Sequence, residues 1–336
     1  MSPSVPLLHQ RFPALREALP HLRLGSAPTP VRRLPGLSTG AAPLWMKCEG
    51  AFGDGGWGGN KVRKLEWLLA DALRQGRRTI LTVGGLGTNW GLATALYARD
   101  QGLHTALALI DQPVDDHVRA QLTRLEQSGA TVHFTHTKAR TLALAPFLAA
   151  RHMTGGRLPY FIPPGGSSPI GVLGYVEAAL EIAAQVRCEV LPEPSHIVTA
   201  VGSGGTAAGL LLGLQLCGLR NTKVVAVVVN DTLRLDPPSL VRLACRTKKV
   251  LVSLGADLPP TDIRRNGLIV VRDWLGPAYG HATEDGEHAR QVAADTEDLV
   301  LEPVYTAKSM AALLALNAVG RLGAGPVLYL DTNGPR

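Results

Sequence analysis

Short apolar runs alternate with stretches of helical spacing through the middle of the chain. The apolar runs predict strands at residues 79–83, 105–110, 131–134 and 158–162. Apolar residues three or four apart predict helices between them, at residues 89–101, 117–127 and 141–152. Because strands that alternate with helices form parallel sheets with right-handed crossovers, we expect a small α/β domain at about residues 57–170.

The chain on either side of this region predicts a second, larger domain formed by residues 1–56 and 171–336. It begins with a proline-rich arm and a short strand or loop at residues 29–34. Further strands are predicted at residues 44–47, 196–201, 224–229, 267–271 and 326–330. Helices are predicted at residues 171–186, 206–216, 240–245, 284–296 and 307–318. The first of these helices carries few charges and is expected to be mostly buried.

The segment GGNKVRK, at residues 58–64, marks the start of a predicted helix that runs to about residue 74. Its two glycines relax the backbone, and Asn60 is suited to cap the helix. Lys61 then lies in the first turn, and Lys64 follows one turn later on the same side. A helix start beside two lysines predicts a site for a phosphorylated ligand. A solvated basic face is the alternative that the spacing leaves open.

A glycine-rich loop follows the predicted strand 196–201 and opens the next helix. Its sequence is Gly202-Ser203-Gly204-Gly205-Thr206. Backbone N–H groups in such a loop bind a phosphate dianion well. The loop also matches the dinucleotide pattern GxGxxG/A loosely, with Ala207 last and Asp231 after the next strand. A dinucleotide-binding or non-catalytic module, or a tight turn without a ligand, therefore stays open.

A second loop, at residues 84–89, ends the first strand of the small domain. Ligands bind at the carboxyl ends of parallel strands in such sheets. Thr88 and Asn89 open the following helix at this place, so both are candidate ligand contacts. Either residue can also be a helix N-cap, and the two roles are compatible.

Composition narrows the classes of function. The 336-residue chain is 46% hydrophobic and 18% charged, as expected of a globular protein with a sizeable core. Its net charge is +7, but the arginines are scattered and aromatic residues make up only 5%, which argues against nucleic acid binding. The four cysteines lack metal-type spacing and favour a reduced compartment. With no signal-peptide core and no apolar run of about 18 residues, we expect a cytoplasmic protein without a membrane span.

The segment at residues 58–66, GGNKVRKLE, resembles the cofactor-lysine segment of the fold-type II pyridoxal-phosphate (PLP) enzymes. More narrowly, it resembles the 1-aminocyclopropane-1-carboxylate (ACC) deaminase and D-cysteine desulfhydrase family, and the resemblance extends from about residue 28 to the C-terminus. It implies an α/β, two-domain, three-layer parallel-sheet architecture, the tryptophan synthase beta-like PLP fold, with the cofactor in the cleft between the domains. It also implies a Schiff base between Lys61 and PLP, Lys64 near the phosphate, a small amino acid as substrate, and a homodimer.

Other segments extend the resemblance to further site residues. The family's phosphate cradle matches Gly202, Ser203, Gly204, Gly205 and Thr206. Asn89 matches the residue that binds the phenolic oxygen of PLP, and Thr88 matches one near the substrate. Tyr279 and Tyr305 match two tyrosines of the family's active site, so the resemblance implies that both line the cofactor or substrate.

The residue after Tyr305 separates two reactions within the family. ACC deaminases place a glutamate there, near the pyridine nitrogen, whereas this chain has Thr306, as D-cysteine desulfhydrase-like members do. A second hydroxyl, Thr332, lies in a turn that resembles the family's last one, so either threonine can meet that nitrogen. Without a carboxylate the ring is a weaker electron sink, which suits the loss of a good β leaving group. We therefore expect α,β-elimination and deamination of a small amino acid such as D-cysteine, with ACC deamination as the alternative.

The chain departs from the family's pattern at four positions near the implied site. Cys48 and Gly50 interrupt a run that is Lys-Arg-Glu-Asp in relatives. Gly87 and Trp90 flank Thr88-Asn89 where relatives have polar residues. These changes are expected to reshape the pocket. Elsewhere, an isolated H-x-x-H pattern at residues 133–136 has no further ligands, so no metal site is expected.

Overall fold

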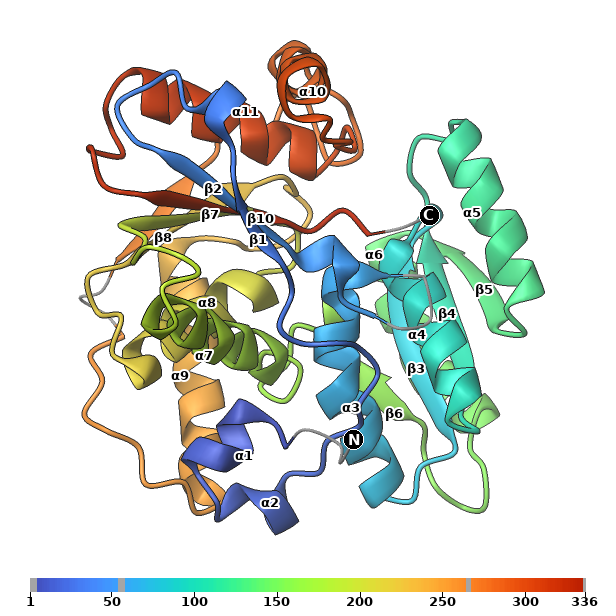
Figure 1. Cartoon of the computed structure of the whole chain (residues 1–336). Coiled ribbons are helices and arrows are strands. Elements are labelled where there is room, and N and C mark those ends of the chain that lie inside the picture. Colours follow the sequence, from blue (N-terminus) through green and yellow to red (C-terminus); the bar gives the residue numbers. More distant parts are fainter. Residues whose placement is uncertain (1–4, 54–57, 264–266, 335–336) are drawn as a thin grey trace.

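The computed structural model describes residues 5–53, 58–263 and 267–334. Figure 1 shows two sheets, each with helices on both faces, so the predicted α/β, three-layer architecture is confirmed. The strands of the smaller sheet all lie within the segment predicted as the small domain. The domain limits themselves stay a prediction, and residue 57 lies outside the described residues.

The larger sheet has six strands in the order β1-β2-β10-β7-β8-β9. They span Val31–Arg33 (β1), Leu44–Cys48 (β2), His196–Val201 (β7), Lys223–Val228 (β8), Leu268–Val271 (β9) and Val327–Asp331 (β10). Neighbouring strands are parallel except β1 and β2, which are antiparallel. The central strands β7, β8 and β10 are buried almost throughout, as parallel strands covered on both faces are.

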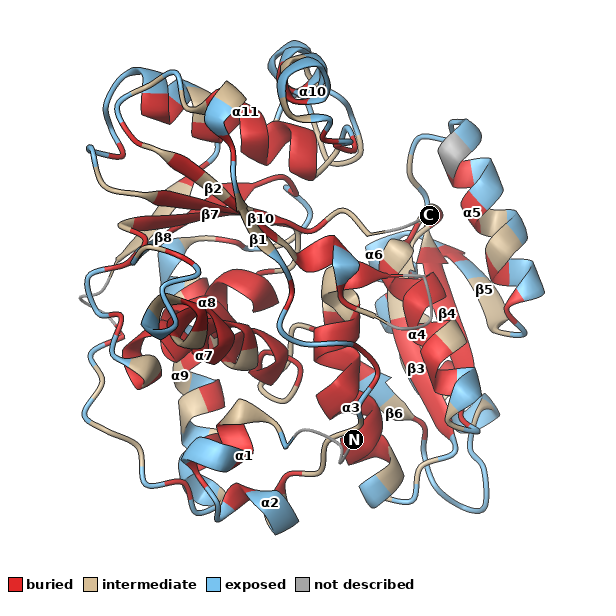
Figure 2. Cartoon of the chain, viewed as in Figure 1, coloured by how far each residue is buried: buried red, intermediate tan, exposed pale blue. Residues whose placement is uncertain are grey.

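Helices cover both faces of the larger sheet. They are α7 (Leu173–Arg187), α8 (Gly205–Cys217), α9 (Pro237–Ser253), α10 (Glu284–Glu297) and α11 (Thr306–Ala318). Val198 and Val225 share a core with Met310 of α11, whereas Ile197 and Val224 share the opposite core with α7 and α8. Successive side chains of a strand point to opposite faces, so adjacent residues supply two cores. Figure 2 shows the consequence, with α8 buried nearly throughout and α10 exposed on its outer side.

The smaller sheet has four parallel strands in the order β5-β4-β3-β6. They span Thr79–Gly85 (β3), His104–Ile110 (β4), Thr131–His136 (β5) and Tyr160–Ile162 (β6). The helices of this region are α3 (Val62–Arg74), α4 (Asn89–Asp100), α5 (Asp116–Gln127) and α6 (Lys138–Arg151). Leu92 and Val118, from α4 and α5, pack with Leu107 on one face, and Leu148 of α6 packs with Ala108 on the other.

Two short helices, α1 (Leu7–Arg11) and α2 (Leu15–Ala18), lie where the sequence predicted only an arm. Leu8 is buried in a core that includes Trp67 of α3. The carboxylate of Glu177 accepts hydrogen bonds from the backbone N–H groups of Leu7 and Leu8, at 2.5 and 2.8 Å. Helices this short are not stable alone, so these distant contacts determine them and local spacing does not predict them.

Helix α9 departs most from its predicted limits. The sequence predicted residues 240–245, whereas the helix spans Pro237–Ser253. Asp236 caps it by accepting a hydrogen bond from the backbone N–H of Ser239 at 2.8 Å. Its first two residues are prolines, which fit a first helical turn because their absent N–H groups are not needed there. The remaining connections include 3-10 turns at Pro35–Leu37, Glu49–Ala51, Gly59–Lys61 and Pro164–Gly166.

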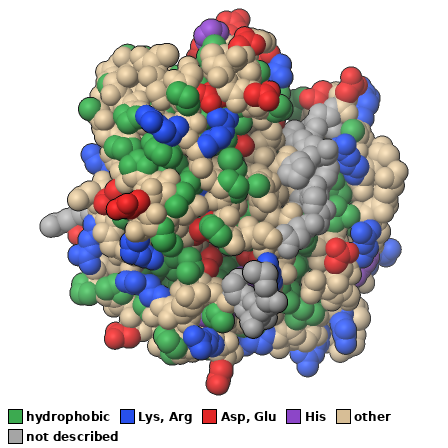
Figure 3. Space-filling view, viewed as in Figure 1, with side chains coloured by type: hydrophobic (Ala, Val, Ile, Leu, Met, Phe, Trp, Pro, Cys, Tyr) green, Lys and Arg blue, Asp and Glu red, His purple; other side chains and the backbone are tan. Residues whose placement is uncertain are grey.

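The surface agrees with the composition. On the face in Figure 3, lysine and arginine side chains lie in separate small groups among polar and apolar ones. Within residues 5–53, 58–263 and 267–334, no helix combines the length and the apolar character needed to cross a lipid bilayer.

Candidate active site

A cavity of about 490 Å³ lies where the carboxyl ends of β3 and β7 approach each other. Residues from both sheets line it, including the ends of both strands and the turn after β10. Twelve of the predicted site residues line the cavity: Lys61, Lys64, Thr88, Asn89, Gly202, Ser203, Gly204, Thr206, Tyr279, Tyr305, Thr306 and Thr332. Gly205 does not line it, but it is the first residue of α8 and adjoins the same loop. The structure therefore brings the predicted residues together.

Lys61 is the last residue of a 3-10 turn and directly precedes α3. Gly58 and Gly59 enter this turn with positive φ of 100° and 44°, which only glycine adopts readily. Asn60 does not cap α3, so that prediction is wrong; its Oδ1 instead accepts a hydrogen bond from Lys61 Nζ at 2.9 Å. The tight turn places a side chain at residue 60 beside the lysine amine instead of above the helix N–H groups.

Gly50, one of the departures from the family, lies where three backbone segments meet. A Cβ on Gly50 would lie 1.8 Å from the carbonyl oxygen of Asn333. A Cβ on Gly59 would lie 2.9 Å from the Cα of Gly50, and one on Gly334 would lie 2.9 Å from the backbone nitrogen of Gly59. An aspartate at residue 50 therefore does not fit this arrangement, which holds the C-terminal turn against the lysine segment.

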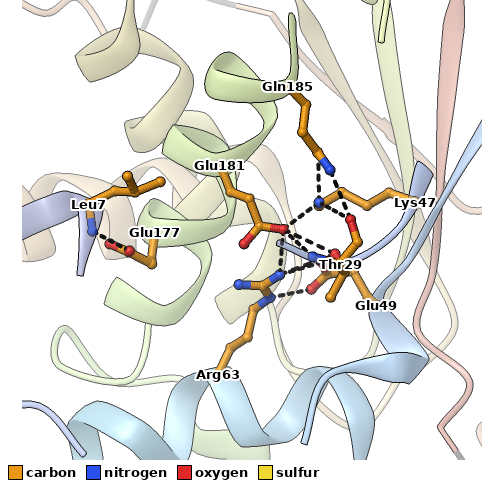
Figure 4. Close-up of polar contacts among 8 residues, drawn as sticks. All are labelled: Leu7, Thr29, Lys47, Glu49, Arg63, Glu177, Glu181 and Gln185. Carbon is orange, nitrogen blue, oxygen red and sulfur yellow. Dashed lines mark hydrogen bonds and ion pairs between the residues drawn. The ribbon is translucent and has the colours of Figure 1, made fainter. Parts of the chain in front are cut away.

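A buried cluster of charged side chains surrounds Arg63 at the start of α3 (Figure 4). Arg63, two residues after Lys61, forms ion pairs with Glu49 (Nε–Oε2, 2.6 Å) and Glu181 (Nη2–Oε1, 3.1 Å). Lys47 Nζ contacts Glu181 Oε1 at 2.5 Å. All four side chains are almost fully buried, and their two positive and two negative charges balance. Loss of one member would leave an uncompensated buried charge, which is strongly destabilising.

The other departure in the Lys-Arg-Glu-Asp run, Cys48, ends β2 beside Asp331 of β10. Burial, followed by the charge of Asp331, raises the pKa of the Cys48 thiol. Burial also raises the pKa of Asp331 to about 7. Asp331 directly precedes Thr332, one of the two threonines predicted to meet the ring nitrogen.

The loop between β7 and α8 has the geometry of an anion cradle. Gly204 has φ +89°, and a Cβ on it would lie 2.6 Å from Leu240 Cδ2. A Cβ on Gly202 would lie 2.7 Å from Tyr305 Cε1. Larger residues would therefore fill the space between the loop and its neighbours. The hydroxyl of Ser167 links the loop, because it accepts from the N–H of Gly205 at 2.9 Å and donates to Ser203 Oγ at 2.8 Å.

Lys64 lies beside this loop. Its Nζ donates to the carbonyl oxygen of Gly165 at 3.0 Å, and a Cβ on Gly205 would lie 3.1 Å from the same nitrogen. Burial, followed by the charge of Lys61, lowers the pKa of Lys64 to about 7. A buried amine next to backbone N–H groups favours a doubly negative ligand, which would restore the charged form of the amine.

The loop after β3 presents side chains instead of bare backbone. Thr88 Oγ1 accepts a hydrogen bond from the N–H of Gly91 at 3.0 Å and so caps α4. Asn89 Oδ1 accepts one from Gln121 Nε2 at 2.7 Å. Trp90 is buried and donates from its indole nitrogen to Thr82 Oγ1 at 2.9 Å, with its ring next to Gly166. Trp90, one of the departures from the family, thus packs between β3 and the 3-10 turn that contains Gly166.

Gln112 occupies the space beside the Gly87 departure. A Cβ on Gly87 would lie 2.9 Å from Val118 Cγ2 and 3.1 Å from Gln112 Nε2, and one on Gly85 would lie 2.1 Å from Gln112 Oε1. The carboxamide of Gln112, which lines the cavity, therefore lies against the two glycines. The motif at residues 84–89 gives no sign of this residue, because Gln112 follows a different strand, β4.

The two predicted tyrosines are in contact. Their hydroxyl oxygens lie 2.6 Å apart, and their rings meet edge to face at 6.1 Å. Burial raises the pKa of Tyr279. Asp231, which the dinucleotide interpretation used, accepts a hydrogen bond from the backbone N–H of Tyr279 at 3.1 Å. Buried Lys308 donates to the carbonyl oxygen of Leu275 at 2.6 Å, so it holds the segment that leads to Tyr279.

Thr306 begins α11 and interacts closely with Glu302. Its Oγ1 accepts a hydrogen bond from the N–H of Glu302 at 2.8 Å. The carboxylate of Glu302 accepts from the N–H groups of Val304 (3.0 Å), Tyr305 and Thr306 (2.7 Å). This carboxylate lines the cavity but is bound to the helix start. Thr306 and Thr332 also line the cavity, and the Thr306 hydroxyl is itself bound to the backbone of Glu302. Which threonine meets the pyridine nitrogen stays a prediction.

The histidines of the H-x-x-H pattern point to different partners. His133 Nε2 lies 2.7 Å from His152 Nε2, and His136 Nδ1 lies 3.1 Å from Asp111 Oδ1. In the part of the chain that the structure describes, no group of three or more His, Cys, Asp or Glu side chains is arranged to hold a metal ion.

The residues of the cavity fit PLP. The narrow glycine loop and Lys64 suit a phosphate dianion, Lys61 supplies a primary amine for an aldehyde, and Asn89 supplies a carboxamide. Lys61 and the loop line one cavity, whose volume is ordinary for a cofactor site.

Comparisons with known proteins agree with this fit. The D-cysteine desulfhydrase of Klebsiella pneumoniae (strain 342) is 35% identical to this chain over 323 residues. The D-cysteine desulfhydrase of Salmonella paratyphi A is 34% identical over 323 residues. Each alignment covers 94% of this chain and 94% of the relative. The crystal structure of an ACC deaminase homologue superposes with a TM-score of 0.80 at 31% identity, covering 96% of this chain and 94% of the other. A hydrogen sulfide-producing enzyme from Fusobacterium nucleatum, 14% identical, shares the fold with a TM-score of 0.61 and coverage of 94% and 95%.

The family described as pyridoxal-phosphate dependent enzyme matches residues 22–332. The predicted cofactor and the predicted resemblance are thus confirmed, and the dinucleotide alternative has no support. This chain belongs to the pyridoxal-phosphate dependent enzyme family.

Proposed function

We propose that this enzyme catalyses α,β-elimination from a small amino acid with a β leaving group, with D-cysteine as the expected substrate. D-Cysteine and one water would yield pyruvate, ammonia and hydrogen sulfide. The observation that carries the proposal is a single cavity that joins Lys61, the 202–206 loop and Thr306. The relatives named D-cysteine desulfhydrase support this substrate. ACC deamination is disfavoured because Thr306 stands where ACC deaminases have glutamate.

PLP, when bound, supplies an electron sink for negative charge at the α-carbon of an amino acid. Lys61 Nζ would hold the cofactor covalently, be displaced by the substrate amine, and then accept the α-proton, since its attachment to the cofactor would leave it within reach of that carbon. The 202–206 loop and Lys64 would bind the phosphate. Asn89 would donate to the phenolic oxygen, and Thr306 or Thr332 would face the ring nitrogen.

Thr88, Tyr279 and Tyr305 would form the substrate side. Because Thr88 Oγ1 already accepts from Gly91, its own proton is available to donate to a substrate carboxylate. The raised pKa of Tyr279 keeps that hydroxyl protonated. The tyrosine pair can therefore donate a hydrogen bond to the departing sulfur.

The lysine assignment is tested by borohydride reduction and peptide mapping. The purified protein is expected to be yellow, and reduction should attach a pyridoxyl group to Lys61. The Lys61→Ala variant should lose nearly all turnover, on the order of 10³-fold or more, because both covalent binding and proton transfer are lost. Lys138→Ala, which removes another lysine of the cavity lining, is the matched control and should stay active. A colourless protein that takes up no PLP, or an adduct on another lysine, would contradict the assignment.

The substrate is tested by keto-acid release from D-cysteine, L-cysteine, β-chloro-D-alanine, D-serine and ACC. We expect product from D-cysteine and β-chloro-D-alanine. Product from ACC alone would overturn the elimination proposal and the use made of Thr306. Product from none of them would direct attention to Gly87 and Trp90, where the sequence departs from the family's pattern, and to Gln112 beside Gly87.

We also propose that the protein is a cytoplasmic homodimer. The support is the family resemblance, since relatives are commonly dimers, and the cysteine usage, which favours a reduced compartment. Sedimentation of the purified protein at micromolar concentration should give twice the 35.6 kDa mass of the chain. A monomer mass across the concentration range would contradict the dimer.

A further inference from the structure

A chain of three polar side chains leads from the surface of α5 to the cavity. Gln121 of α5 is fully buried. Its Nε2 lies 2.7 Å from Asn89 Oδ1, and its Oε1 lies 3.0 Å from Arg124 Nη1. Arg124 is half-buried and lies one turn further along the same helix. The hydrogen bonds thus run from Arg124 through Gln121 to Asn89.

The direction of this chain is determined by chemistry. A guanidinium group has only N–H donors, so the atom of Gln121 that meets Arg124 must be its carbonyl oxygen. The amide nitrogen of Gln121 must then face Asn89 and donate to it. The atom of Asn89 that accepts must be its own carbonyl oxygen. Carboxamide orientations are otherwise ambiguous, but a partner that can only donate removes the ambiguity.

The consequence for the cavity is a donor of fixed orientation. With its oxygen bound to Gln121, Asn89 has its Nδ2 amide hydrogens left, and Asn89 lines the cavity. Among the described residues, no hydrogen bond from Asn89 Nδ2 to another side chain competes for them. Without Gln121 in this orientation, the carboxamide could turn and present its oxygen instead.

We infer that Gln121, oriented by Arg124, is a positioning residue that holds Asn89 as a hydrogen-bond donor toward the phenolic oxygen of the cofactor. The inference rests on the proposed role of Asn89. A phenolic oxygen that carries negative charge accepts a hydrogen bond from an N–H group and is repelled by a carbonyl oxygen. The pair therefore decides whether Asn89 attracts or repels the ring oxygen, although neither residue lines the cavity.

The test reverses the direction of the chain with Gln121→Glu. A glutamate has two acceptor oxygens, can still pair with Arg124, and forces Asn89 to donate to it. Asn89 would then present its oxygen to the cavity. Gln121→Met removes the constraint without reversing it, so the carboxamide can still turn to donate. Gln127→Glu adds the same charge at an exposed position of the same helix and is the matched control.

The readouts are the dissociation constant of PLP for the apoprotein and the visible absorption band of the bound cofactor. We expect Gln121→Glu to weaken PLP binding about ten- to a hundredfold and to shift the absorption band. Gln121→Met should weaken PLP binding less than about tenfold, and Gln127→Glu should match the wild-type protein. A role that is only structural would lower stability in the first two variants equally and leave the band unchanged.

Wild-type affinity and an unchanged band in folded Gln121→Glu would overturn the inference. If Gln121→Glu does not fold, Arg124→Met is the fallback variant, because Arg124 is only half-buried. This substitution frees the carboxamide of Gln121 to turn. A weakened affinity for PLP and a shifted absorption band would then support the inference, and unchanged values would overturn it. Failure of the wild-type protein to bind PLP would instead overturn the proposed function, and this inference with it.

Discussion

Two helices, α4 and α8, begin at the cavity, and their first turns differ. Thr88 caps α4 with its own hydroxyl, and Asn89 extends a carboxamide held by Gln121. Gly204 precedes α8 and has no side chain with which to cap it; the N–H of Gly205 is bound by the hydroxyl of Ser167, from another segment. One helix start thus offers side chains to the cavity, and the other offers glycine backbone together with Ser203 and Thr206.

The difference corresponds to two kinds of ligand group. A phosphate is compact and multiply charged, so several backbone N–H groups at a helix start suit it, and side chains would only hold it away. A ring oxygen or a carboxylate needs a single donor at a set distance, which a side chain supplies. The two loops are therefore expected to fail in opposite ways, the α8 loop when atoms are added and the α4 loop when atoms are removed.

Of the changes to the two loops, Gly204→Ala is expected to have the largest effect. An alanine there would have to adopt φ +89°, and its Cβ would lie 2.6 Å from Leu240 Cδ2. The loop must therefore shift, and its N–H groups would no longer point at the phosphate. PLP affinity should fall about a hundredfold, equivalent to roughly 2.8 kcal/mol, measured by titration of the apoprotein. Gly218→Ala is the matched control, since Gly218 has φ +92° at the other end of α8 but open space around the added atom. It should lose stability without loss of PLP affinity, and equal losses of affinity would contradict the cradle.

The next largest effect is expected in the pH dependence of phosphate binding, because the α8 loop has a buried cation, Lys64, beside it. Burial and then Lys61 lower the pKa of Lys64 to about 7, so above pH 7 the amine is mostly neutral without a ligand. A phosphate dianion stabilises the charged amine, so the pKa of Lys64 is higher in the complex and binding takes up a proton. Affinity should therefore fall as pH rises above about 7, approaching tenfold per pH unit.

Inorganic phosphate is the probe for this prediction, because it avoids titration of the cofactor ring. Lys64→Arg keeps its charge throughout this range, so its affinity should vary little between pH 7 and 9. Lys138→Arg, at another lysine of the cavity lining, should keep the wild-type slope. A flat profile in the wild-type protein would show that Lys64 does not change its charge on binding.

Features with a local cause could be predicted from the sequence. Alternation of apolar runs and helical spacing predicted both sheets, since that pattern depends on neighbours a few residues apart. The lysine segment and both loops were found because a few adjacent residues carry each motif. Asn60 was assigned wrongly because the predicted helix start ignored the 3-10 turn that precedes Val62. A one-residue difference in where the helix begins moves a side chain from the cap to the amine of Lys61.

Features that depend on distant contacts could not be predicted. Arg63 and Glu181 are 118 positions apart, and Asn89 and Gln121 are 32 apart. Each pairing exists only after the helices pack, and each residue alone looks like an ordinary polar position. The resemblance places a polar residue where this chain has Gly87, but that Gln112 lies beside this glycine follows only from the approach of β4 to β3.

The smallest effect is expected from Thr88→Ser, and it tests whether the α4 loop works through its hydroxyl. Serine keeps the oxygen that caps α4 and the proton available to a substrate carboxylate, so PLP affinity and KM should stay within about threefold of wild type. Thr88→Ala removes both; it should lower stability by about 1 kcal/mol and raise KM while the PLP dissociation constant stays nearly unchanged. Thermal unfolding and steady-state kinetics with D-cysteine separate these outcomes. A serine variant as impaired as the alanine variant would assign the role to the Thr88 methyl group, which packs beside Gly91, and would weaken the contrast between the two loops.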